Sequence, residues 1–469
     1  MNFPTEILSQ IGLYLDPASH HVYTAACHEW RQVFTPYLWS EIDTGAQPWK
    51  SIFRSASPAA VPDLLSAHRR RVRDLTIHDV ESLNIVLYAN LRDLYSLRVY
   101  TRHNTFSNPD FLSVDVPMFL NLLTNDEKWD NHIRSKDGEN VFYDTLTLWR
   151  LVLTNPGLRK LELLNTTDHS GYTIFDDPVE SAESFLVLAL SRYLLAVSHL
   201  EIGWECGDML LCELARFFLN LESFVHVGRK VDFRPSSLLP SCHLNLRVLT
   251  FENQITADQM RAVLFAFPRL QSLSIQTLTC TAKTFPSIDV IQKTLNFCPI
   301  LNRLEFSLEQ RQHLIEGALS QLSTIDFDLG PKKEPHPLKA LINSDSNGEC
   351  FTADSLITRL PFLVKLDVRI INVAVLVAIT TTCKALEYAR FSLEAPYPDG
   401  LCQFFASCSR LKECLGDGHI IAAEDLITRP EWACVGLEKL DIERPPCPGT
   451  TAHGHQVETS TRLQGSSFL

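Results

Sequence analysis

A short apolar pattern recurs along most of this chain, and it limits the possible folds more than any other feature. The pattern is L-x-x-L-x-L, with other apolar residues allowed at the three fixed positions, as in "LRKLEL", "LQSLSI" and "LVKLDV". Eight of the twelve gaps between successive copies are 21 to 26 residues long, so the spacing approaches one period. Such a period predicts stacked structural repeats. The thirteen copies begin at Val72, Leu94, Leu158, Val197, Leu221, Leu246, Leu270, Leu301, Leu322, Leu363, Leu386, Leu411 and Leu437.

Each copy ends in alternating apolar and polar residues, which is typical of a short strand with one buried face. Segments between the copies, such as "TADQMRAVLFAF", have helical periodicity, and Thr256 is the expected N-cap of that helix. Strand, helix and parallel strand in succession predict an α/β fold. We expect a curved, right-handed solenoid over residues 72–444, with a parallel sheet on its inner face.

Four gaps are longer than the period and indicate insertions or missed repeats. We interpret residues near 101–145, inside the longest gap, as one insertion. A second is predicted near 330–350, where "GPKKEPHPLKALINSDSNGE" has the Pro and Lys content of an exposed loop. The composition of residues 445–469 predicts a flexible tail.

The chain has thirteen cysteines, an odd number, and we expect them to be reduced thiols. Four recur three positions before the first leucine of a copy, which favours a packing role beneath the turn from helix to strand. These four are Cys298, Cys383, Cys408 and Cys434. Cys402, Cys408 and Cys414 are separated by five-residue spacers that match no common zinc pattern. We therefore predict no metal and no cofactor.

The first forty residues are a different kind of segment. Pro4 suits the first position of a helix, and Asp16-Pro17 predicts the end of that helix and the start of a second. Trp30 and Trp39 are expected to hold these helices together or to join them to the repeats. One apolar stripe at helical spacing carries Phe3, Ile7, Leu8, Ile11 and Leu15.

The stretches "FPTEILSQIGLYLDP" and "CHEWRQVFTPYLW" resemble the F-box in most of its characteristic positions. The family usually has Leu at the position of Phe3, followed by Pro-x-Glu-Ile-Leu, which residues 4–8 match. We expect an F-box over residues 1–42 and a connecting segment with short helices over residues 43–71. An F-box followed by irregular leucine-rich repeats is similar to the F-box/leucine-rich-repeat proteins, especially the fungal members.

The resemblance implies a three-helix F-box that docks on a Skp-type adaptor, which links it to a cullin and a RING subunit. The protein would then be the substrate receptor of an SCF-type ubiquitin ligase. A forty-residue module also buries too little apolar surface to be stable on its own. Its apolar stripe is therefore expected to pack against the solenoid or against another protein. The candidate adaptor-binding residues are Phe3, Pro4, Ile7, Leu8, Ile11 and Leu15.

The alternative is that these helices only cap the solenoid, because repeat arrays require caps. The protein would then be a leucine-rich-repeat interaction scaffold outside any ligase. The discriminating feature is whether the stripe faces solvent or packs on the first repeats.

The polar position between the second and third fixed positions is expected to point from the inner sheet face. We hypothesise that acids at this position select a protein substrate with a basic surface, through steering and register. The alternative is that a chain of net charge −13 simply has acidic surface positions. The six acids are Glu162, Glu201, Glu305, Asp326, Asp367 and Asp441.

Charge and motifs exclude other classes of function. A net charge of −13 argues against nucleic-acid binding, which needs concentrated Lys and Arg. The sequence has no G-x-S-x-G elbow, phosphate loop, zinc signature or dinucleotide fingerprint, so we predict a receptor without catalytic residues. No secretory signal or membrane-length apolar run is found, which favours the cytoplasm or the nucleus.

Overall fold

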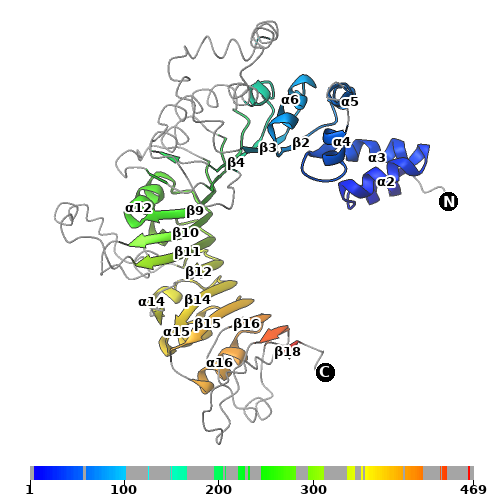
Figure 1. The fold of residues 1–469 in the computed structure, drawn as a ribbon. Helices are drawn as coiled ribbons and strands as arrows, with labels where there is room; N and C mark the ends of the chain where they lie inside the picture. Colours follow the sequence, from blue (N-terminus) through cyan, green and yellow to red (C-terminus); the bar gives the residue numbers. More distant parts are fainter. Residues whose placement is uncertain are drawn as a thin grey trace, which may run out of the picture. The chain divides into compact units, whose positions relative to one another are not determined.

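The structure is a computed structural model, and Figure 1 shows its fold coloured along the sequence. The chain divides into two compact units. One unit comprises residues 1–233 and 242–245, and the other comprises residues 234–241 and 246–469. The structure describes residues 5–55, 60–101, 125, 148, 150–165, 195–203, 206–207, 220–227, 231–232, 245–280, 294–310, 335–343, 350–351, 354–394, 397–415, 434, 436–440 and 463–464.

The first unit begins with three helices, α1 (Thr5–Gly12), α2 (Pro17–Ala26) and α3 (His28–Ser40). Helix α2 begins at Asp16-Pro17, as the sequence predicts, but α1 ends at Gly12, four residues before the predicted end. The Asp16 carboxylate accepts a hydrogen bond of 2.8 Å from the backbone N–H of Ser19 and so caps α2. Helix α3 leads directly into the first strand.

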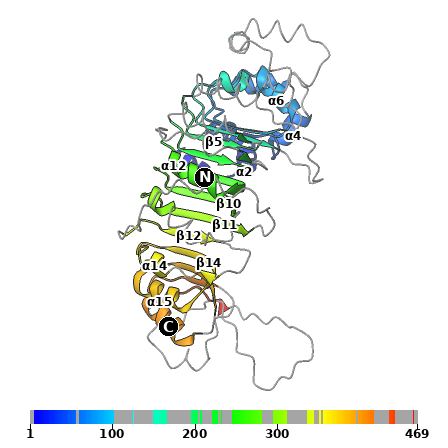
Figure 2. The same ribbon diagram turned by 90° about the vertical axis from the view of Figure 1, so that its left-hand side faces the viewer.

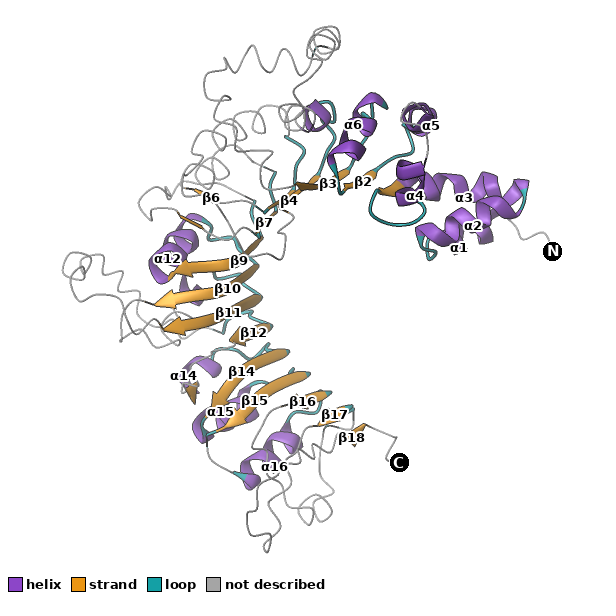
Figure 3. Ribbon diagram, viewed as in Figure 1, coloured by secondary structure: helices purple, strands orange, loops and turns teal. Residues whose placement is uncertain are grey.

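The strands of the first unit form an open parallel sheet, because each one pairs in parallel with the next (Figure 3). The strands are β1 (Glu41–Asp43), β2 (Asp74–Ile77), β3 (Ser96–Thr101), β4 (Lys160–Asn165), β5 (His199–Ile202) and β7 (Ser223–His226). The helices between them are α4 (Trp49–Ser55), α5 (Ala60–His68) and α6 (Val80–Tyr88). A separate pair is formed by β6 (Cys206–Gly207) and β8 (Val231–Asp232).

The sheet of this unit starts one strand earlier than the repeat pattern predicts. Strand β1 pairs with β2, although the first predicted copy begins only at Val72. Trp39, Ile42 and Thr44 occupy the three fixed positions of this additional copy, and all three are buried. A Trp and a Thr at fixed positions hide the copy from a search for leucine-like residues. The short helices α4 and α5 confirm the prediction for the segment that follows.

The second unit also has an open sheet of parallel strands, with helices stacked in chain order along one side (Figures 2 and 3). The strands are β9 (Val248–Thr256), β10 (Ser272–Cys280), β11 (Arg303–Gln310), β12 (Ala340–Asn343), β14 (Lys365–Ile371), β15 (Tyr388–Leu393), β16 (Glu413–Leu415) and β17 (Lys439–Leu440), and β13 (Cys350–Phe351) pairs with β14. The helices are α12 (Ala257–Ala266), α14 (Asp354–Ile357), α15 (Val373–Thr382) and α16 (Pro398–Ser407). Thr256 caps α12 in a capping box, as predicted.

The predicted loop near 330–350 is wrong where it includes β12. This strand pairs in parallel with β11 on one side and β14 on the other, and Leu338 and Leu341 are fully buried. Its copy, "LKALIN", has Asn343 at the third fixed position and so escapes the pattern. Because β11 pairs directly with β12, the copy predicted at Leu322 does not supply the strand between them; that segment lies outside the described residues.

Two other predictions concern the ends of gaps and of the chain. Strand β3 pairs directly with β4, so the longest gap adds no strand between them, as expected of an insertion. The predicted tail is wrong at Leu463–Gln464, which form β18 and pair antiparallel with β17.

The side chains at the fixed positions form the apolar core of both units. Every described first position from Val72 through Leu411 is at most 3% exposed, and the second and third positions are buried with them. Each such side chain contributes about 2 kcal/mol through removal from water. Parallel register brings equivalent side chains of neighbouring strands to the same level, so each strand covers the next. The α/β class with open parallel sheets is confirmed.

A hydrogen bond between successive copies fixes the turn from helix to strand. We call it the repeat bracket. The donor is a side chain that lies just before one copy. The acceptor is the backbone carbonyl that lies three residues before the first fixed position of the preceding copy. The thiol of Cys298 donates to the carbonyl of Phe267, and that of Cys383 donates to Leu360, at 3.7 and 3.5 Å between heavy atoms. The recurring cysteines therefore have the packing role that the sequence predicts.

Other residue types form the same repeat bracket. The amide of Asn155, three positions before Leu158, donates to the carbonyl of Leu91 at 2.9 Å. Before β12 the equivalent position is a proline, and His336 takes over: its Nε2–H donates to the carbonyl of Cys298 at 3.1 Å. Its Nδ1 accepts from the backbone N–H of Leu338, so the buried ring is neutral and fully bonded.

The repeat bracket of His336 predicts a pH dependence of folding in the second unit. Burial lowers the pKa of His336; its hydrogen bond to Cys298 opposes this, and the positive charge of Arg359 adds to it. The unfolded chain therefore takes up the proton first as pH falls. The stability is fully present above about pH 6.5, the ordinary histidine pKa, and is lost progressively below it.

The test is to measure the unfolding free energy of the wild type and of His336→Gln by denaturant unfolding at about pH 7.5 and about pH 5.5. The neutral amide of Gln can donate the same hydrogen bond. Between these pH values the wild type should lose about 1 kcal/mol more unfolding free energy than the variant. Equal losses in both proteins would contradict the role of His336.

Candidate functional site

The first candidate site is the apolar stripe on the N-terminal helices. Ile7 is 47% exposed and Ile11 is 39% exposed, and Tyr14, three residues beyond Ile11, is 87% exposed. Ile7 and Ile11 are four residues apart in α1 and so share one face, whereas Tyr14 lies in the turn that follows the helix. Large apolar side chains exposed together on one helix face are typical of a recognition surface.

The other predicted members of the stripe behave differently. Leu8 is only 4% exposed, so the prediction that it belongs to an accessible surface is wrong; it packs inside the helices. Leu15 is half-buried. Phe3 and Pro4 lie outside the described residues. The stripe is therefore divided, with Ile7 and Ile11 on its exposed side.

The two predicted tryptophans have separate roles. Trp30 packs against Tyr23 and Phe34, with ring centroids 5.1 and 5.9 Å apart, and so holds α2 to α3. Trp39 packs edge-on against Trp49 and stacks on His68, at 4.8 and 4.1 Å. Trp39 thus joins α3 to the helices that follow it.

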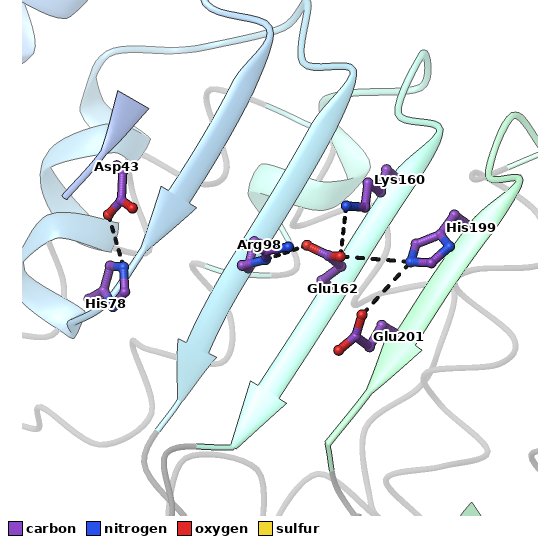
Figure 4. A network of polar contacts seen from close by, with 7 residues as sticks. All are labelled: Asp43, His78, Arg98, Lys160, Glu162, His199 and Glu201. Atoms are coloured by element: carbon purple, nitrogen blue, oxygen red, sulfur yellow. Dashed lines mark hydrogen bonds and ion pairs between the residues drawn. The ribbon is translucent and has the colours of Figure 1, made fainter. Parts of the chain in front are cut away.

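The second candidate site is the polar face of the sheet in the first unit. Strand alternation places Arg98, Glu162 and Glu201 on one face, in direct register across β3, β4 and β5. Lys160 and His199 precede the two glutamates by two residues and so lie on the same face. Figure 4 shows these side chains turned toward one another.

Glu162 is the centre of this charged cluster, although its side chain is only 3% exposed. Its carboxylate accepts hydrogen bonds from Arg98 Nε and, at 2.8 Å, from Lys160 Nζ. His199 Nε2 lies 3.7 Å from Glu162 and 3.8 Å from an oxygen of Glu201, too far for hydrogen bonds. The cluster therefore joins three adjacent strands by charge pairing.

The pKa values reflect this arrangement. Burial opposes ionisation of Glu162, but its contacts with His199, Arg98 and Lys160 outweigh burial and hold its pKa well below its usual range. The contacts with Glu162 and then Glu201 raise the pKa of His199, and burial partly offsets them. The hydrogen bond to Glu162 raises the pKa of Arg98. Glu162 is thus a buried carboxylate that stays charged because cations surround it.

The remaining predicted acids are dispersed. Glu305, in the second unit, pairs with Arg303 of its own strand at 2.7 Å. Asp367 is half-buried, and burial raises its pKa, with Arg390 and Lys365 opposing. Asp326 and Asp441 lie outside the described residues. Each described acid of the row thus has a cation near it, so the row is not a simple acidic surface.

Sequence reasoning missed the neighbouring row of the same face. The residue two positions after the first fixed position is often Lys, Arg or His. Its side chain points to the same side of the sheet as the acids. Reading this position down the copies would have found the pairing partners. These residues are Lys160, His199, Arg303, Lys365 and Lys439.

The cysteine run predicted to be structural consists of buried thiols. Cys402, Cys408 and Cys414 are at most 5% exposed, and burial raises the pKa of Cys408 to about 12. Among the cysteines whose side chains the structure describes, none forms a disulfide; these are Cys27, Cys298, Cys383, Cys402, Cys408, Cys414 and Cys434. Thiols with so high a pKa stay protonated near neutral pH.

Comparisons with known proteins leave the chain unassigned: no protein-family model matches it, and no curated protein matches it. None of the helices that the structure describes has the length and apolar character needed to cross a membrane.

The charged cluster predicts a coupling between Arg98 and Glu162. Arg98→Met should lower the unfolding free energy by about 2 kcal/mol, because it leaves the buried Glu162 carboxylate with fewer cations. The double variant Arg98→Met/Glu162→Gln should be more stable than Arg98→Met alone, since no uncompensated charge remains. Denaturant unfolding of the wild type, of Arg98→Met, of Glu162→Gln and of the double variant measures this. Additive losses in the double variant would show that the two residues do not interact.

Proposed function

We propose that this protein is the substrate-recognition subunit of an SCF-type ubiquitin ligase. Residues 1–42 act as an F-box that binds a Skp-type adaptor and, through it, a cullin and a RING subunit. The repeats capture a protein substrate for ubiquitination. The proposal rests on the resemblance of the first forty residues to the F-box and on the exposed stripe described above.

The single observation that carries the proposal is the exposure of Ile7 and Ile11. These two side chains, one helical turn apart, remain accessible after α1 has packed into the first unit. If α1 served only to cap the sheet, its large apolar side chains would be expected to be covered. An adaptor groove that accepts this helix face would cover them.

In this proposal both units belong to a leucine-rich-repeat solenoid that is right-handed and curved, with the strands on the inner side. Parallel pairing of successive strands, burial of the fixed positions and the repeat bracket all support it. The substrate meets the polar face of the strands. Because acids there lie beside Lys, Arg and His, we expect a partner surface of mixed charge rather than a purely basic one.

The chemistry of ubiquitin transfer belongs to other subunits in such an assembly. The RING subunit recruits the conjugating enzyme, and the receptor supplies proximity and orientation of the substrate. The receptor therefore needs no catalytic residues of its own.

A second candidate function is a leucine-rich-repeat scaffold whose first helices only cap the array. The stacking of Trp39 on His68 favours it, because this contact ties α3 to α5 beyond the three N-terminal helices. The two candidates differ in whether Ile7 and Ile11 have a partner.

Co-purification with a Skp-type adaptor separates these candidates. The wild type should bind the adaptor stably, and Ile7→Asp/Ile11→Asp should lose capture, because two charges would have to be buried in an apolar contact. Leu64→Asp is the matched control: Leu64 is an exposed apolar residue of α5 in the same unit, and its variant should bind as the wild type does. Absence of binding by the wild type, or equal binding by all three, would reject the ligase receptor.

A further inference from the structure

The charged cluster of the first unit contains three metal-ligand atoms that converge on one point. Glu162 and Glu201 are directly opposite on β4 and β5, and His199 lies beside both (Figure 4). One carboxylate oxygen from each glutamate and one ring nitrogen of His199 lie within 4.8 Å of one another. Backbone pairing of the two strands holds all three side chains on the same face.

The ring nitrogen of His199 gives an independent indication of a ligand. Its Nε2 is buried from solvent, and within the described residues it has no hydrogen-bond partner. It points between the two carboxylates, at 3.7 and 3.8 Å. In the neutral form of the ring, a metal ion between the two carboxylates would give this nitrogen the bonding partner that it lacks.

The donor set identifies the class of ion. One imidazole nitrogen with two carboxylate oxygens suits Zn²⁺ and related transition metals, whereas Mg²⁺ and Ca²⁺ prefer oxygen alone. Bonds of about 2.0–2.1 Å in a tetrahedron place neighbouring ligand atoms about 3.3 Å apart. The separations of His199 Nε2 from the two carboxylates, 3.7 and 3.8 Å, exceed this, so metal binding requires the three side chains to move closer together.

The two cations of the cluster affect this site in opposite ways. Arg98 bonds one oxygen of Glu162, whereas His199 and Lys160 approach the other oxygen. Arg98 can therefore stay and orient the carboxylate, as outer partners of metal ligands do. Lys160 competes with the ion for the same oxygen, but its side chain is 37% exposed and can turn to solvent. The two carboxylates then offset the charge of the ion, and Arg98 leaves the site with one net positive charge.

We propose that Glu162, His199 and Glu201 bind one divalent transition-metal ion, with Zn²⁺ the preferred one, on the polar face of the first unit. The ion would cross-link β4 to β5. Three protein ligands leave at least one coordination position for water or for a donor group of a bound partner. This inference does not depend on the proposed ligase role.

Titration of the metal-stripped full chain with Co²⁺ tests the site, because the spectrum reports the ligand type. The wild type should bind one Co²⁺ with the weak visible bands of nitrogen and oxygen ligands and should release it to Zn²⁺. His199→Gln and Glu201→Gln should each weaken binding by more than about tenfold. Glu305→Gln, which removes an ion-paired carboxylate in the other unit, is the matched control and should bind as the wild type does.

Lys160→Gln adds a test that misfolding cannot imitate. Removal of the competing ammonium group should tighten Co²⁺ binding several-fold. The proposal would be overturned by a lack of Co²⁺ binding in the wild type, by intense thiolate bands from the cysteines, or by wild-type affinity in the His199→Gln and Glu201→Gln variants.

Discussion

Most of the described repeat strands bury three apolar side chains at the level where their neighbours bury theirs. Parallel register imposes this, because Leu97, Leu161 and Leu200 lie directly opposite one another on successive strands. The alternate positions of the same strands are then forced onto the other face, where they form rows of polar side chains. Both the charged cluster around Glu162 and the repeat bracket follow from this constraint, since each links residues that the register has already aligned.

Much of the fold could be predicted from the sequence, because the fixed positions recur with one period. Failures occurred where a copy replaced leucine by another residue: Asn343 hid β12, and Thr44 hid β1. The site was less predictable. Ile7 and Leu8 are adjacent on a helical stripe, and only the packing of α1 decides that the first is exposed and the second buried. Arg98 and Glu162 are 64 residues apart, so their pairing needs the strand register.

The structure separates two kinds of surface within the first unit. The exposed stripe on α1 is apolar and small, as suits a helix docked in a groove. The sheet face is polar, and its charges are largely paired within the protein, so a partner must offer complementary hydrogen bonds and charges rather than one sign of charge. In the proposed receptor the first surface fixes the protein to the ligase, and the second selects what is modified.

Hydrogen–deuterium exchange of the full chain, with and without a Skp-type adaptor, tests this account most directly. The amides of Ile7 through Tyr14 should exchange more slowly in the presence of the adaptor, while those of β3, β4 and β5 should not change, since that face stays free for a substrate. Slower exchange in the strands but not in α1 would contradict the account, as would a complete lack of change. Either result would mean that the N-terminal helices serve the repeats and bind no adaptor.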